Sequence, residues 1–248
     1  MTDSLLALRQ VTKRFGGITA LNALSCAVPQ GRIIGIIGPN GAGKTTVFNV
    51  VTGAYKASAG EVVFDGRSIA GLAPYRIARL GIARTFQNIR LFGSMSVWEH
   101  LLVAQRHAGL RRLLPTGWAE PTARRRAEEI LVFFGLEEVR YRRAASLPYG
   151  TQRKVEMARA LIAEPKLLLL DEPVAGMNQG EAEELRELLL EVRRAGLTIL
   201  VIEHDMPFVM SLCDYLYVLD FGTLIAEGEP AAVQRDPRVL DAYLGQEA

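Results

Sequence analysis

The nine residues "GPNGAGKTT" at 38–46 constrain this chain more than any other stretch. They follow the apolar run "IIGII" and precede "KTTVFNVVTG", which predicts a buried strand, a glycine-rich turn and a helix that stops at Gly53. This is the context of a phosphate-binding loop, whose backbone N–H groups and helix N-terminus face an anion. Residues predicted to contact a bound nucleotide are Gly38, Pro39, Asn40, Gly41, Ala42, Gly43, Lys44, Thr45 and Thr46.

A second motif, "LLLLDEP", supplies carboxylates for phosphate chemistry. Asp171 ends a buried apolar run, so its side chain can hold Mg²⁺ together with the hydroxyl of Thr45, while Lys44 reaches the β- and γ-phosphates. Glu172 is then placed to orient or deprotonate an attacking water. Read alone, Asp-Glu-Pro also fits an acidic helix start. The phosphate-binding loop is what favours ATP hydrolysis.

The order of patterns predicts an α/β chain. The first 35 residues contain short strand-like runs of a small sheet, and the runs 167–170 and 198–202 are apolar throughout, as in strands buried on both faces of a largely parallel sheet. Between them, the segment from about 95 to 143 is helical and rich in arginine. Asn178 and Glu181 have the spacing of a capping box for a helix that stops at Gly196.

Composition bounds the cellular setting. Apolar residues make up 49% of 248 residues and the mean hydropathy is +0.14, which fits docking to a membrane partner as well as Leu- and Ala-rich helices. No run approaches the ~18 apolar residues of a spanning helix, and we expect no signal peptide. Cys26 and Cys213 have no metal-ligand spacing, so we expect small buried thiols in a reducing cytoplasm.

Positive charge is concentrated between Arg106 and Arg143, where nine arginines face five glutamates. A solvated helical surface is the first interpretation of this run, and a surface for anionic lipid or an acidic partner is the second. Stacking aromatics are not interleaved with the arginines, which disfavours nucleic acid as a partner.

Four motifs in order resemble those of an ABC ATPase: the phosphate-binding loop, "SLPYGTQRKVEMARAL", "LLLLDEP" and "VIEHD". The resemblance covers essentially the whole chain. It implies a P-loop NTPase core with a mainly parallel sheet, a small antiparallel β subdomain and an inserted α-helical subdomain. In this scheme 1–248 is a single domain, in which 1–86 and 156–248 form the core and 87–155 the helical subdomain with the signature motif.

The same resemblance assigns expected roles residue by residue. Gln87 in "RTFQN" is similar to the glutamine that senses Mg²⁺, the γ-phosphate and the membrane partner. His204 is similar to the switch histidine near the γ-phosphate, and Phe15 to the aromatic that stacks on adenine. Residues 176–178 fall in the loop that crosses to the partner subunit, where Asn178 replaces the usual aspartate.

The signature of the family departs from its usual form here. Pro148 and Tyr149 stand where serine and glycine are expected, and proline has neither the hydroxyl nor the N–H that would bind a γ-phosphate. Tyr149, Gly150 and Thr151 remain, at the start of a helix whose N-terminus attracts an anion. One missing neutral hydrogen bond costs about 1 kcal/mol, so we expect a weakened but working ATP sandwich.

The Tyr-Gly pair, "RTFQNIRLFGSMSVWEHLLVA" and a terminal "AYLG" resemble the ATPase subunits of branched-chain amino acid importers. The resemblance implies ATP and Mg²⁺ as cofactors and a peripheral location on the cytoplasmic face of the inner or plasma membrane. It also implies a second ABC ATPase subunit, transmembrane permeases that meet residues 87–99 and, indirectly, an extracellular substrate-binding protein.

Three alternatives stay open. A urea or amide importer would use a closely similar subunit. A soluble ATP-driven dimerisation clamp usually carries two cassettes, coiled-coil insertions or basic-aromatic patches, none of which occurs here. A small-molecule kinase on the same loop is disfavoured by the signature and by His204, and would transfer phosphate to an acceptor and not to water.

Overall fold

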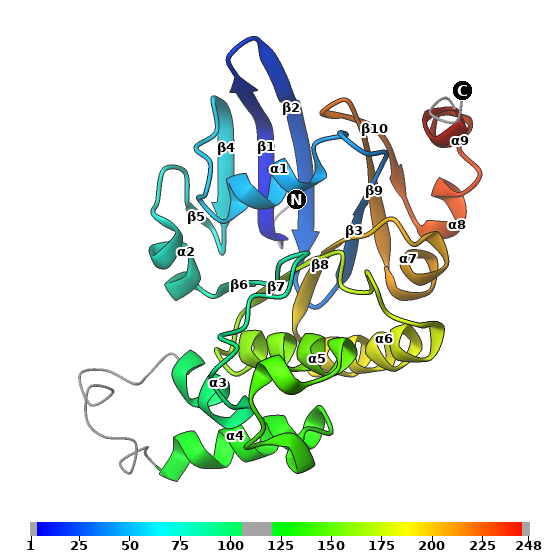
Figure 1. Cartoon of the computed structure of the whole chain (residues 1–248). Helices are drawn as coiled ribbons and strands as arrows, with labels where there is room; N and C mark the ends of the chain where they lie inside the picture. The colour runs from blue at the N-terminus through cyan, green and yellow to red at the C-terminus, as the bar shows by residue number, and fades with distance from the viewer. Residues whose placement is uncertain (1–3, 106–120, 245–248) are drawn as a thin grey trace.

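The computed structural model describes residues 4–105 and 121–244, which form two β-sheets with helices packed around them (Figure 1). One sheet has the order β2-β1-β4-β5 and the other β10-β9-β3-β8-β7-β6. The strands of the first sheet are β1 (Ser4–Phe15), β2 (Ile18–Pro29), β4 (Ala59–Phe64) and β5 (Arg67–Ser68). The strands of the second are β3 (Ile33–Ile37), β6 (Ile82–Arg84), β7 (Leu167–Asp171), β8 (Thr198–Ile202), β9 (Tyr215–Asp220) and β10 (Thr223–Gly228).

The second sheet is parallel from β6 to β9, and only the β9–β10 hairpin is antiparallel. All five residues of β3, of β7 and of β8 are buried, as the uniformly apolar runs predicted. Because parallel strands end at the same edge, the segments that follow β3, β6, β7 and β8 all emerge together. This edge is where the nucleotide motifs lie.

Alternate residues of each central strand enter different cores. Ile33, Leu168 and Ile199 belong to a cluster shared with the helices on one side of the sheet. Their neighbours Ile34 and Leu169 belong to a second cluster, which fills the space between the parallel sheet, α1 (Lys44–Val51) and the antiparallel sheet. Because alternate side chains of each central strand point to opposite faces, the parallel sheet packs against the helices on one face and against α1 and the antiparallel sheet on the other.

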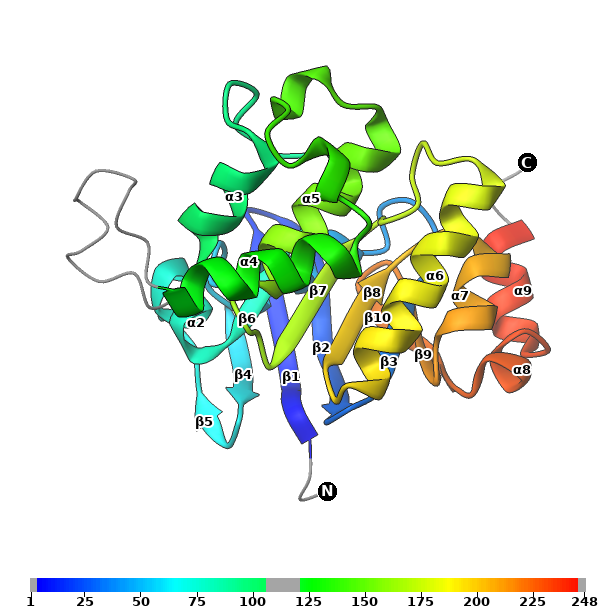
Figure 2. The ribbon, with the colours of Figure 1, turned by 90° about the horizontal axis from the view of Figure 1, so that it is seen from below.

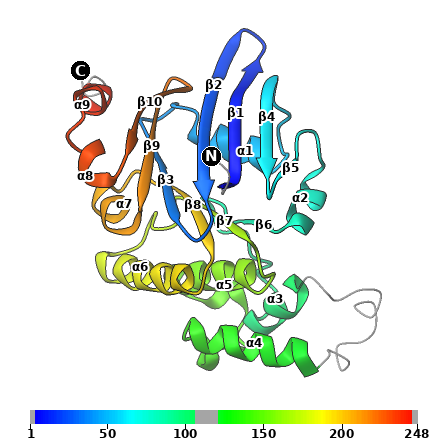
Figure 3. The ribbon, with the colours of Figure 1, turned by 180° about the vertical axis from the view of Figure 1, so that it is seen from behind.

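The antiparallel sheet and the helical lobe lie at opposite ends of the molecule (Figures 1 and 3). The lobe consists of α3 (Val97–Ala104), α4 (Pro121–Phe133), two short 3-10 turns and the start of α5 (Tyr149–Leu161). Helix α5 is continuous through residues 155 and 156, so the expected division between core and lobe falls inside one helix. The division itself stays a prediction.

The remaining helices cover the flanks of the parallel sheet. Seen from below, α6 and α7 lie beside the central strands, and α8 and α9 lie beyond them near the C-terminus (Figure 2). The bounds of these four helices and of α2 are as follows: α2 (Pro74–Leu80), α6 (Gln179–Arg194), α7 (Met206–Leu212), α8 (Pro230–Val233) and α9 (Pro237–Leu244). Within the described ranges, no helix combines the length and the apolar character that crossing a bilayer requires.

The arginine-rich region is described only in part, since residues 106–120 and their arginines lie outside the described ranges. Arg125 pairs with Glu129 at 2.9 Å and Arg140 with Glu128 at 2.8 Å, and the Arg125 side chain is 83% exposed. These contacts fit the solvated helical surface that the sequence suggests.

The two cysteines are not bonded to each other. Cys213 is buried as expected, whereas Cys26 on β2 is only half-buried. Burial raises the pKa of the Cys26 thiol to about 12, with the charge of Glu227 contributing, so both thiols stay protonated and weakly nucleophilic near neutral pH.

Helix α6 offers a test of the predicted capping box. The Asn178 side chain accepts a hydrogen bond from the Glu181 N–H at 3.0 Å, and Glu181 accepts one from the Asn178 N–H at 3.0 Å. We expect Asn178→Ala to lower the free energy of unfolding by about 1 kcal/mol, measured by urea denaturation. Asn178→Asp is the control and should retain most of the stability, because aspartate caps as well as asparagine; equal losses in both variants would contradict this account.

Candidate functional site

The phosphate-binding loop follows β3 and has the backbone that its glycines permit. Gly38, Gly41 and Gly43 have φ values of 144°, 81° and 98°, which other residues rarely adopt. A Cβ on Gly38 would lie 2.0 Å from the Leu219 carbonyl oxygen, and one on Gly43 would lie 2.6 Å from that of Ala20. Strands β9 and β2 thus hold the loop from behind, and alanine does not fit at either position.

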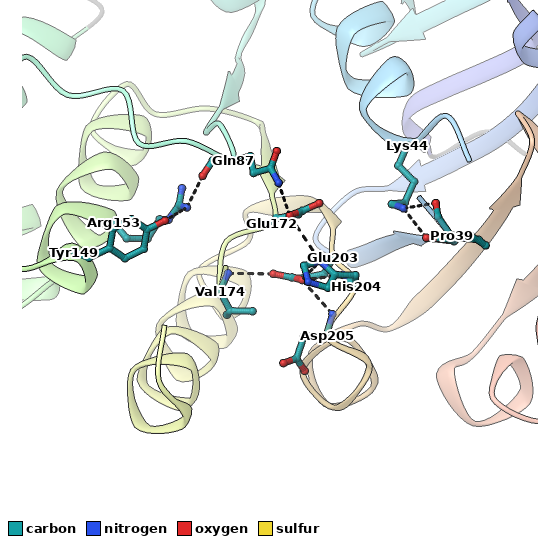
Figure 4. Close-up of polar contacts among 11 residues, drawn as sticks. Pro39, Lys44, Gln87, Tyr149, Arg153, Glu172, Val174, Glu203, His204 and Asp205 are labelled. Carbon is teal, nitrogen blue, oxygen red and sulfur yellow. Dashed lines mark hydrogen bonds and ion pairs between the residues drawn. The ribbon is translucent and has the colours of Figure 1, made fainter. Parts of the chain in front are cut away.

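Lys44 crosses this loop from the first turn of α1. Its ammonium group donates hydrogen bonds to the carbonyl oxygens of Gly38 at 2.5 Å and Pro39 at 2.8 Å (Figure 4). Burial lowers the pKa of Lys44, and the carboxylates of Glu172 and Asp171 act in the opposite direction. Thr45, in the same turn, is exposed.

Asp171 ends β7 with its carboxylate almost fully buried. Its Oδ2 accepts a hydrogen bond from Arg84 at 2.8 Å, and the other terminal nitrogen of Arg84 donates to Asn49 Oδ1 at 2.7 Å. Arg84 therefore connects the end of β6 to Asp171 and to α1. Sequence reasoning missed Arg84, because its partners Asn49 and Asp171 lie 35 and 87 positions away in the sequence.

Gln87, Glu172 and His204 converge at the carboxyl edge of the sheet (Figure 4). Gln87 Nε2 donates to Glu172 Oε2 at 2.8 Å, and His204 Nδ1 lies 3.7 Å from the same oxygen. Glu172 has φ 47°, an uncommon conformation for a residue with a side chain. Its N–H donates to the Ile202 carbonyl oxygen of β8 at 2.8 Å, which ties the two strand ends together.

Glu203 was not singled out from the sequence, yet its side chain is fully buried among backbone N–H groups. Oε1 accepts from Val174 at 3.1 Å, and Oε2 accepts from His204 at 2.8 Å and from Asp205 at 3.2 Å (Figure 4). One carboxylate thereby joins the segment after β7 to the segment after β8. Its place in "VIEHD", directly after a buried strand, was the available signal.

Phe15 lies at the tip of the β1–β2 hairpin and is 41% exposed. Its ring meets Tyr55 edge to face at 5.1 Å between centroids, and the Lys13 ammonium lies 4.6 Å from the Phe15 centroid. Ala20, on the same hairpin, is the residue that contacts Gly43. The exposed aromatic face is therefore attached to a strand that also supports the phosphate-binding loop.

The signature residues lie on the opposite side of Glu172 from Lys44 (Figure 4). Helix α5 begins at Tyr149, and Pro148, which precedes it, makes no side-chain cap. A Cβ on Gly150 would lie 2.5 Å from Glu181 Oε1, and one on Gly176 would lie 3.3 Å from the Tyr149 ring. Within one chain, the start of α5 thus approaches Gly176 and Glu181, on the side of Glu172 away from Lys44.

The site has the hard oxygen donors that Mg²⁺ prefers, in the form of the Asp171 carboxylate, the Thr45 hydroxyl and the Gln87 amide. The Arg84 contact engages Oδ2 of Asp171 and leaves Oδ1 without a hydrogen bond from Arg84. Among the described residues no cluster of three or more His, Cys, Asp or Glu side chains could hold a metal by itself. The donor set thus suits a Mg²⁺ ion that is shared with substrate phosphates.

Two family models match the chain. The model described as "ABC transporter" matches residues 21–175, and the one described as "Branched-chain amino acid ATP-binding cassette transporter" matches residues 223–248. A high-affinity branched-chain amino acid transport ATP-binding protein, LivG of Salmonella typhimurium, is 45% identical over 255 residues, covering 99% of this chain and 100% of LivG.

Solved structures give the same answer. The ADP conformation of MJ1267, an ATP-binding cassette of an ABC transporter, has a TM-score of 0.87 and 37% identity, covering 98% of this chain and 100% of that one. A dimeric post-hydrolysis state of the cassette MJ0796, bound to ADP and Pi, has a TM-score of 0.77 and 25% identity, covering 91% and 98%.

These matches confirm the fold class and the resemblance that the sequence motifs predicted. They extend over the full length of the chain and include the loop, the strand ends and the α5 helix described above. The chain belongs to the ABC transporter family and is one of its ATP-binding subunits.

Proposed function

We propose that this chain hydrolyses ATP as the nucleotide-binding subunit of a membrane importer for branched-chain amino acids. The observation that carries the proposal is the convergence of Gln87, Glu172 and His204 beside the phosphate-binding loop at one sheet edge. The ATPase class follows from the family, and the substrate from the names of the relatives with 42–45% identity.

The geometry suggests how the reaction proceeds. The loop amides and Lys44 hold the phosphates of ATP, and the exposed ring of Phe15 offers a surface for the adenine. Glu172 would orient the attacking water and accept its proton, and His204, whose Nδ1 lies 3.7 Å from Glu172 Oε2, would contact the γ-phosphate beside it. Gln87 fixes the direction of the Glu172 carboxylate.

Mg²⁺ would be held by Thr45, Asp171 and Gln87, and it would neutralise charge on the β- and γ-phosphates. Arg84 keeps the Asp171 carboxylate in one orientation by binding Oδ2. This arrangement leaves the other carboxylate oxygen of Asp171 free of Arg84. The Asp171 carboxylate is therefore oriented as a metal ligand before the nucleotide binds.

The position of the signature favours a dimer. Since Tyr149, the first residue of α5, lies across Glu172 from Lys44, the signature at this helix start suits the ATP of a second subunit better than the ATP of its own. The first N–H groups of α5 remain available there because Pro148 supplies no side-chain cap. The second subunit is an identical copy or a related chain.

The partners follow from the family and from the lobe. We infer that residues 87–99 form the groove for a transmembrane permease, and Phe92 within it is 61% exposed. An extracellular binding protein would then select the amino acid, and this chain would sit peripherally on the cytoplasmic face of the membrane. No residue described here contacts the transported substrate in this scheme.

Dimerisation is the first test. In the presence of ATP and Mg²⁺, Glu172→Gln should accumulate as a dimer, because the amide keeps the shape of the side chain but cannot accept a proton. Light scattering and gel filtration measure the mass, and ATP turnover should fall at least about 100-fold. Lys44→Ala in the same background is the control and should stay monomeric; a monomer in Glu172→Gln itself would contradict the proposal.

Glu203 provides a test of the strand-end geometry. In Glu203→Gln, one oxygen becomes an NH₂ group that faces a backbone N–H, so a buried donor loses its acceptor. We expect a loss of about 2 kcal/mol in the free energy of unfolding and a fall in kcat larger than the change in KM. Asp205→Asn, which alters a neighbouring cap contact with Phe208 N–H, is the comparison and should leave kcat nearly unchanged.

The importer assignment is tested by the partners. A tagged chain purified from detergent-solubilised host membranes should bring multi-span permeases with it, and proteoliposomes of that complex, supplied with ATP and the extracellular binding protein, should take up leucine, isoleucine or valine. Urea or short amides are the competing substrates. Uptake of urea without leucine uptake would reassign the substrate, and recovery of cytosolic proteins alone would reject the importer function.

A further inference from the structure

Arg153 on α5 is a charged side chain with no exposed surface, which is rare without a structural or functional reason. Its guanidinium donates to four acceptors. One terminal nitrogen bonds the Phe86 carbonyl at 2.8 Å and Glu156 Oε2 at 2.9 Å. The other bonds the Gln87 carbonyl at 2.8 Å and the Tyr149 hydroxyl at 3.1 Å (Figure 4).

The contacts of Arg153 lie between two functional segments. On one side, Tyr149 is the first residue of α5, is 43% exposed and packs its ring against Gly176. On the other side, the backbone carbonyl of Gln87 accepts a hydrogen bond from Arg153, and the side-chain amide of Gln87 donates one to Glu172. Both hydrogen bonds are 2.8 Å long. The series Tyr149–Arg153–Gln87–Glu172 is continuous through hydrogen bonds.

We propose that Arg153 is a positioning residue that couples the two ATP sites of the dimer. This inference rests on the proposed function, in which the start of α5 binds the ATP of the partner subunit. A γ-phosphate that draws the start of α5 toward it moves Arg153, which pulls the carbonyls of Phe86 and Gln87 and thereby adjusts the contact that Gln87 already makes with Glu172. Each chain thus becomes active when its signature is filled.

The chemistry of the side chain fits this role better than a purely structural one. The planar guanidinium fork fixes two adjacent carbonyl oxygens at a defined spacing, which a lysine ammonium cannot reproduce. Glu156 neutralises the buried charge and accepts the Arg90 N–H at 3.3 Å through its second oxygen. Lysine at position 153 would therefore preserve the charge pair and lose the fork.

A fluorophore on the Gln87 segment reports this coupling directly. Asn88 is exposed, whereas the raised pKa of both native thiols keeps them weakly nucleophilic, so Asn88→Cys can be labelled selectively. In the Glu172→Gln background, ATP and Mg²⁺ should form the dimer and change the emission of the label. Adding Arg153→Lys should leave dimerisation intact by light scattering and remove the change in emission.

The matched control is Arg159→Lys. Arg159 is on the same helix and donates to the Arg90 carbonyl of the same segment at 2.7 Å, whereas Gln87 and Tyr149 accept their hydrogen bonds from Arg153. It should keep the full change in emission. With Glu172 intact, Arg153→Lys should lower kcat about tenfold with KM for ATP within about twofold, as misplacement of a catalytic contact predicts.

Tyr149→Phe is a second variant that tests the coupling even if Arg153→Lys does not fold. It removes only the hydroxyl bond to Arg153 and leaves the ring on Gly176, so it should reduce the change in emission while circular dichroism stays unchanged and the melting temperature falls by only a few degrees. An unaltered emission change in a folded Arg153→Lys dimer would overturn the coupling and leave the ATPase intact. Absence of the dimer in the Glu172→Gln parent would overturn the proposed function together with this inference.

Discussion

Three short strands without polar side chains in their central positions determine the rest of this structure. Strands β3, β7 and β8 are buried on both faces, so each face of the sheet must be covered by another layer. Polar chemistry is then confined to the strand ends and the residues just beyond them. Asp171, Glu172, Glu203 and the phosphate-binding loop all occupy such positions, which is why motifs far apart in the sequence share one site.

The same constraint explains why the buried charged side chains at this edge each bind several partners. Isolated charges taken out of water are costly, and leaving one of a buried pair alone costs about 3–5 kcal/mol. Arg153 therefore binds Glu156 and two carbonyls, and Glu203 binds three backbone N–H groups. Each buried charge also fixes the positions of the backbone segments that supply its hydrogen bonds. The burial of these charges therefore also aligns the segments around the site.

Local patterns predicted the strands and helices that carry the motifs, but not the side chains that join them, and the roles of the expected site residues stay predictions. The strand, loop and helix at 33–51 and the Asn178–Glu181 cap follow from contiguous sequence. Arg84 meets Asp171 across 87 positions, and Arg153 meets Phe86 across 67. An arginine in a helix or at a strand end has the same local pattern whether it faces water or a distant carbonyl, so only tertiary packing distinguishes them.

Contacts from several elements fix both the backbone and the carboxylate of Glu172. A positive φ at a residue with a side chain costs about 1–3 kcal/mol and persists only where the surroundings determine it. Here its N–H is held by Ile202 on β8, and its carboxylate by Gln87. The neighbouring strand thus fixes the backbone, while the segment after β6 fixes the side chain. Because α5 holds that segment through Arg153, the direction of the Glu172 carboxylate depends on contacts from β6, β7, β8 and α5 together, and a change in any one of them reaches the same oxygen.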